Sequence, residues 1–219
     1  MATRQVLADV ADLWRQRGHG DAAFESVGGV DAARRVQDGE PFDLVVLAAD
    51  AIDKLIATGR VVAGSRVDIA RSGVAVAVPV GAPRPAIATE EALRDAVLSA
   101  HAIGYSTGPS GVALCKLFER WGIFDTICDR LVQAPPGVPV GTLLARGDVT
   151  LGFQQGSELI HVEGVAVLGA MPPGLEIVTT FSGGVCSTSR QPDAARALLD
   201  FIRSPAADAA RQRHGMWTA

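Results

Sequence analysis

Hydroxyl and amide side chains stand where several expected strands end or helices begin. Thr3, Ser106, Ser110 and Gln155 hold such positions, and each can donate a hydrogen bond to an anion. The free N–H groups of a helix start carry partial positive charge and favour a negative ligand. Taken singly, Thr3 and Ser110 are as readily explained as caps of their own helices. Taken together, these positions predict an anion pocket.

Four helix starts are expected to line one crevice, because helices that follow parallel strands begin at the same edge of the sheet. These helices begin near residues 3, 29, 110 and 137–140. A carboxylate could also be held by the two-pronged guanidinium of an arginine such as Arg4 or Arg71, although a solvated surface arginine is the plainer explanation. The expected ligand-binding residues are Thr3, Arg4, Gly28, Gly29, Ser106, Ser110, Gly111, Val138 and Gln155.

Other kinds of chemistry find little support. The four histidines and three cysteines show no metal-ligand spacing, so we expect neither a metal site nor a disulfide framework. The glycine-rich stretch 104–111 lacks the Lys-Ser/Thr pair of a phosphate-binding loop and the spacing of a dinucleotide fingerprint. We therefore expect no cofactor.

Composition limits the partners. The chain has 219 residues, of which 48% are hydrophobic and 20% charged, with a net charge of −4. This is enough apolar sequence for one large domain or two small lobes, and the acidic balance argues against a nucleic-acid partner. No long uncharged apolar window predicts membrane insertion, and no secretory signal is visible at Met1. As it stands, the sequence predicts a cytoplasmic protein.

Helical and strand patterns alternate along the chain, which predicts an α/β fold with mainly parallel sheet. The uninterrupted apolar run 43–48 is typical of a parallel strand that is covered on both faces. Helices are expected over 3–18, 30–38, 51–58, 89–99, 110–121, 138–146, 192–203 and 205–213. Strands or extended segments are expected over 23–27, 43–48, 66–70, 73–80, 102–106, 131–133, 150–153, 165–168 and 176–187.

Three segments carry a family resemblance: 28–50 (GGVDAARRVQDGEPFDLVVLAAD), 147–153 (GDVTLGF) and 192–206 (PDAARALLDFIRSPA). Their order and spacing resemble the type 2 periplasmic-binding-protein family, most closely its molybdate-binding-protein-like branch of solute-binding proteins. The resemblance implies a two-lobed fold with a ligand held in the cleft. Lobe 1 would comprise 1–75 and 180–219, lobe 2 would comprise 76–179, and the crossover strands would lie near 73–80 and 176–181.

The beginning of the chain departs from the family pattern, because Met1 stands where the family's first strand should already have ended. A missing interior strand leaves backbone groups of its neighbours unpaired. The expected explanations are a true start further upstream, which we favour, a fragment, or a partner chain that completes the sheet. An upstream start could carry an export signal, and the protein would then be periplasmic.

The resemblance also bears on the ligand. Molybdate binders of the family use a serine in the loop that matches 28–30 and a tyrosine near residue 155, where this chain has Gly29 and Gln155. The loss of both hydroxyl donors favours a small organic anion, above all a carboxylate, over a tetrahedral oxyanion. We therefore expect a solute-binding protein that closes on such an anion, with an ABC-transporter permease as partner if the protein is exported.

Two alternatives remain open. The same branch includes aconitate isomerase, so the chain could instead be an isomerase of a di- or tricarboxylate. That proton shift needs a base and an electrostatic clamp for the developing charge, and the candidate bases are Glu158, His161, Tyr105 and Glu25. The second alternative is the effector-binding domain of a regulator, against which the absence of a helix-turn-helix segment before Met1 counts.

Overall fold

The computed structural model describes all residues from Met1 to Ala219, and they form two compact units. Unit 1 comprises Met1–Ser72 and Thr179–Ala219, and unit 2 comprises Gly73–Val178. The sequence analysis placed these boundaries at 75/76 and 179/180. None of the helices combines the length and the apolar character that crossing a lipid bilayer requires.

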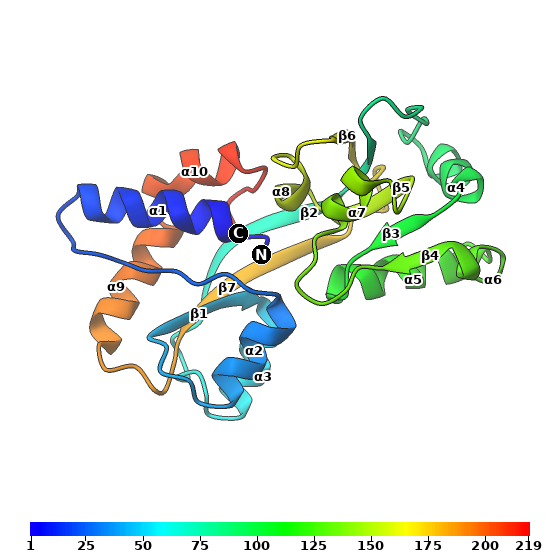
Figure 1. The fold of residues 1–219 in the computed structure, drawn as a ribbon. Helices are drawn as coiled ribbons and strands as arrows, with labels where there is room; N and C mark the ends of the chain where they lie inside the picture. The colour runs from blue at the N-terminus through cyan, green and yellow to red at the C-terminus, as the bar shows by residue number, and fades with distance from the viewer. The chain divides into compact units, whose positions relative to one another are not determined.

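Unit 1 is formed by the first and last parts of the chain, and α1, α9 and α10 lie near the two chain ends (Figure 1). Its elements are α1 (Arg4–Gln16), α2 (Gly29–Gln37), β1 (Leu44–Ala48), α3 (Ala49–Ala57), β7 (Val178–Val185), α9 (Pro192–Arg203), the 3-10 turn η2 (Pro205–Ala207) and α10 (Asp208–Arg213). Strand β2 (Val67–Pro79) begins in unit 1 and ends in unit 2, so the two extended segments expected over 66–80 are one strand.

Strand β1 shows why its apolar run was a good sign of burial and a poor sign of direction. Val45 and Leu47 pack with residues of α2 and α3, while Leu44 and Val46 pack against the core formed by α1 and α9. Both faces are therefore covered, as expected. The strand nevertheless pairs antiparallel with β7, from Leu44 opposite Val185 to Ala48 opposite Phe181. An apolar run indicates that both faces of a strand are buried, and parallel and antiparallel strands can both be buried in this way.

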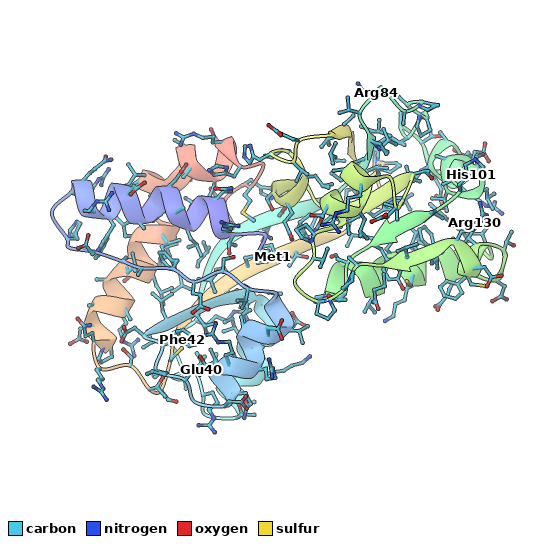
Figure 2. All side chains as sticks on the ribbon, in the orientation of Figure 1. Met1, Glu40, Phe42, Arg84, His101 and Arg130 are labelled. Atoms are coloured by element: carbon cyan, nitrogen blue, oxygen red, sulfur yellow. The ribbon has the colours of Figure 1, made fainter.

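The expected strand over 23–27 is wrong, because this segment joins no sheet. Its side chains still alternate, with Ala22 and Phe24 partly buried against the core of unit 1. The segment is fastened through Arg35, which donates to Glu25 at 2.5 Å and to Glu40 at 2.7 and 2.8 Å. The Arg35 guanidinium also lies over the Phe42 ring, and Glu40 and Phe42 are labelled in Figure 2.

Unit 2 is built on a mixed sheet. Its helices and strands, besides β2, are α4 (Glu90–Ser99), β3 (Ile103–Tyr105), α5 (Pro109–Arg120), α6 (Phe124–Ile127), the 3-10 turn η1 (Cys128–Arg130), β4 (Leu131–Gln133), α7 (Val140–Arg146), β5 (Leu151–Gln155), α8 (Gly156–Leu159) and β6 (Val165–Ala170). The strand order is β2-β5-β3-β4, and β6 pairs with β2. Strand β3 runs parallel to β4 and β5, whereas β2 runs antiparallel to β5 and β6.

The two faces of this sheet carry different side chains. Val74, Val76 and Phe153 pack on one face with α5, and Ala75 and Ala77 pack on the other face with α7. Figure 1 shows α5 and α7 on opposite sides of β3. Successive side chains of a strand alternate between faces, so Ala75 and Ala77 point to the same side. Their small size allows α7 to approach the sheet closely.

Glycines at two neighbouring strand positions make that approach possible. A Cβ atom on Gly104 would lie 2.9 Å from Val140 Cγ1, and one on Gly152 would lie 2.7 Å from Leu144 Cδ1. Gly104 and Gly152 are register partners in the parallel pair β3–β5. Helix α7 therefore rests almost directly on the backbone of the two strands.

Helix α5 approaches the end of β3 even more closely. A Cβ atom on Gly111 would overlap the carbonyl oxygen of Ser106, which is backbone and cannot swing aside. By contrast, a Cβ atom on Gly108 would meet nothing within 4 Å. The first turn of α5 can therefore lie against the 105–107 segment only because residue 111 has no side chain.

We expect Gly111→Ala to lower the free energy of unfolding by about 3 kcal/mol, since overpacking against backbone forces the helix to move. Gly108→Ala is the matched control and should cost at most about 1 kcal/mol, the order of an unfavourable cap residue. Urea unfolding followed by circular dichroism would measure both variants. Equal stabilities of the two variants would show that α5 is not held against Ser106.

Candidate functional site

The carboxyl ends of three parallel strands meet at one edge of unit 2. Tyr105, the last residue of β3, is paired with Gln133 at the end of β4 and with Phe153 near the end of β5. The chain leaves β3 towards α5, β4 towards α7, and β5 directly into α8. In α/β sheets such an edge collects helix starts and polar side chains, and ligands bind there. We call Ser106, Ser110, Gly141, Gln154, Gln155 and Glu158 the strand-end cluster.

The junction of β3 and α5 brings two expected residues together. The hydroxyl oxygens of Ser106 and Ser110 lie 3.1 Å apart, within hydrogen-bonding distance. Ser110 is buried in the first turn of α5, and the close approach at Gly111 sets the position of this turn. Tyr105 stands just before Ser106, and partial burial together with the nearby Cys115 thiol raises the pKa of its phenol.

The end of β5 supplies the other half of the strand-end cluster. Gln154 follows Gly152 by two positions, so its side chain lies on the face that α7 covers. Its Oε1 accepts a hydrogen bond from the backbone N–H of Gly141 in the first turn of α7, at 3.3 Å. Its Nε2 donates to Glu158 Oε2 at 2.7 Å, across the turn from β5 into α8. Gln155 is buried beside it.

Glu158 is the ionisable group of the strand-end cluster. Burial raises the pKa of its carboxyl above the ordinary value, and the hydrogen bond from Gln154 opposes that rise by stabilising the charged form. A carboxyl whose pKa lies above the usual range takes up and releases a proton nearer to neutral pH. Glu158 can therefore act as a general acid or base, which an exposed carboxylate does less well.

Two of the other candidate bases are exposed. His161 follows the end of α8, and Glu25 is a residue of unit 1 that pairs with Arg35. Val138 lies partly buried just before α7, where its N–H donates to the carbonyl of Pro135. No three His, Cys, Asp or Glu side chains gather in a way that could hold a metal ion.

The expected binding residues of unit 1 sit at two helix starts. Gly28 and Gly29 open α2, and Arg4 is the exposed first residue of α1. Thr3 precedes it and is buried, but the expected cap is wrong, since its side chain makes no capping hydrogen bond. The backbone of Thr3 is already helical (φ −89°, ψ 0°), whereas a capping residue adopts an extended conformation. A role for these four residues in binding stays a prediction.

Sequence reasoning missed Gln154 and Gly141. The strand period alone could have found Gln154, because it places residue 154 on the same face as Gly152 and on the side of α7. The partner Gly141 could not be found that way, since only the packing of α7 brings its N–H to the strand end.

We expect Glu158→Gln to gain stability relative to the wild type as the pH rises. A raised carboxyl pKa contributes stability that is complete below the unfolded value of about 4.5 and is lost as pH increases through the folded value. The glutamine keeps an acceptor for Gln154 and carries no charge to be desolvated. Melting temperatures between pH 4 and pH 8 would test this, with the exposed Glu163→Gln as control. A difference that does not change with pH would contradict the burial of a titrating carboxyl at residue 158.

Comparisons with known proteins agree with this fold. The chain is 38% identical over 198 residues to a protein from a Pseudomonas species named aconitate isomerase, covering 89% of this chain and 75% of the relative. The periplasmic molybdate-binding protein of Azotobacter vinelandii superposes with a TM-score of 0.82 at 17% identity, over 99% of this chain and 96% of that one. A periplasmic thiamin-binding protein superposes with a TM-score of 0.75 at 16% identity, over 98% and 78%.

The structural neighbours share the two-lobed α/β fold of periplasmic binding proteins, so the fold expected from the resemblance is confirmed. The family model described as bacterial extracellular solute-binding protein matches residues 1–217. With nearly the whole chain matched, this protein belongs to the bacterial extracellular solute-binding protein family.

Proposed function

We propose that the protein binds a small organic di- or tricarboxylate, with the strand-end cluster of unit 2 as part of its binding site. The observation that carries this proposal is the 38% identity to a protein named for a tricarboxylate, aconitate. The cluster supplies donors that suit carboxylate oxygens: the hydroxyls of Ser106 and Ser110 and the backbone N–H of Ser110 in the first turn of α5.

The residue at position 29 supports an organic anion over a compact oxyanion. A Cβ atom on Gly29 would meet only Leu47 Cδ2, at 3.9 Å, so packing would allow a serine there. The glycine is therefore not imposed by the fold, and it leaves out a hydroxyl that a tetrahedral oxyanion would use. Gln155, in place of a tyrosine, removes a second hydroxyl.

Binding can be tested by calorimetry with cis-aconitate, trans-aconitate, citrate, molybdate and sulfate. We expect a carboxylate to bind and Ser110→Ala to weaken it by about 1–2 kcal/mol, the cost of one lost hydrogen bond to a charged group. Ser99→Ala, at the exposed end of α4, is the matched control and should bind as the wild type does. Tight binding of molybdate or sulfate with no carboxylate bound would refute the proposal.

Isomerisation of the bound tricarboxylate is the second candidate function, and Glu158 is the specific observation that favours it. In this reaction Glu158 takes a proton from the methylene carbon of aconitate, and the electron pair spreads over the conjugated double bond and carboxylate. The proton is then returned to the former vinyl carbon, which moves the double bond and allows its geometry to change. A base with a raised pKa suits such a transfer near neutral pH.

Proton NMR of cis-aconitate incubated with the protein would show formation of the trans isomer. We expect Glu158→Gln to lower kcat by at least about 100-fold, the usual contribution of a positioned base. Glu163→Gln removes an exposed carboxylate from the same unit and should retain full activity. Unchanged turnover in Glu158→Gln would exclude Glu158 as the base.

If the wild type binds a carboxylate without converting it, transport becomes the better explanation of the same site. The protein would then deliver its ligand to an ABC-transporter permease, which is the partner that we propose for that case. The product assay separates these two functions, because an isomerase converts the carboxylate and a transport protein binds it unchanged.

A further inference from the structure

We propose that Gln154 is a positioning residue that holds the Glu158 carboxylate in one orientation by donating a hydrogen bond to its Oε2. This role rests on the proposed isomerisation and deepens it. Gln154 itself lies one step from the reacting atoms, because it acts through Glu158.

The hydrogen bonds of Gln154 fix which way its amide points. Only 3% of Gln154 is exposed, and its Oε1 accepts from the N–H of Gly141 at 3.3 Å. The reverse orientation would set Nε2 against that N–H and Oε1 against a carboxylate oxygen, so both contacts would be repulsive. The donor Nε2 must therefore face Glu158 Oε2, at 2.7 Å.

Close packing of α7 fixes the position of the Gly141 N–H that holds the Gln154 amide. Gly141 is buried, and a Cβ atom there would lie 3.0 Å from Val162 Cγ2, so α7 has little room to shift. Gly152 allows α7 to rest on β5 two residues before Gln154. The N–H that orients the amide is thus held by the same close contact that positions α7.

An oriented carboxylate matters for proton transfer. An acid–base group works best when the reacting oxygen is held at a defined distance and angle from the carbon that loses the proton. With Oε2 engaged by Gln154, rotation of the carboxylate costs a charge-assisted hydrogen bond. A purely structural glutamine would stabilise unit 2 without affecting the chemical step.

The variant Gln154→Leu tests this directly. It removes the amide that donates to Glu158 and adds no charge to the strand-end cluster. We expect kcat for cis-aconitate to fall at least 10-fold while KM changes less than 3-fold. Gln16→Leu makes the same chemical change at the exposed last residue of α1 and should leave both constants as in the wild type. A loss of stability with unchanged kcat would overturn the positioning role.

A measurement without ligand separates this inference from the proposed function. In ¹⁵N-labelled protein, the Gln154 side-chain amide should give a proton signal shifted downfield by its bond to the carboxylate, and Glu158→Ala should remove that shift. The same signal in wild type and Glu158→Ala would overturn the orientation. If the shift is present and the wild type converts no aconitate, the isomerase proposal fails, and the role of Gln154 in positioning a base fails with it, although its orientation stands.

Discussion

The close contact of α7 with the backbone of β3 and β5 is the constraint on which the strand-end cluster depends. Gly104 and Gly152 are register partners, and a side chain on either would push α7 away. Only at this short distance does the N–H of Gly141 reach Gln154, which in turn reaches Glu158. A packing requirement at Gly152 thus determines the position of an ionisable group, Glu158, six residues further along the chain.

Hydrophobic and glycine patterns were enough to place most elements, because those patterns record which faces are covered. They could not give the direction of β1, since helices and a core on its two faces would cover a parallel strand equally well. Segment 23–27 has the alternation of a strand, yet its backbone lacks a neighbouring strand to pair with. Pairing depends on what lies beside a segment in space, and its own residues do not carry that information.

The same limit applies to the candidate site. The spacing of Ser106 and Ser110 around a helix start was readable, and the two hydroxyls do meet. Glu158 was one of four candidate bases, because the sequence does not show which of these side chains is buried. In the structure Glu158 is partly buried, whereas Glu25 and His161 are exposed. Burial and the amide of Gln154 make that distinction, and both arise from tertiary packing.

The central claim, that a small carboxylate binds at the strand-end cluster, is tested most directly by NMR titration of ¹⁵N-labelled protein with cis-aconitate. The account predicts saturable shifts for the backbone amides of Ser110, Gly111, Gly141 and Gln155. The amides of α4 and α6, which contain no residue of the strand-end cluster, should shift less. Saturable shifts confined to residues outside the strand-end cluster, or none at millimolar ligand, would contradict it.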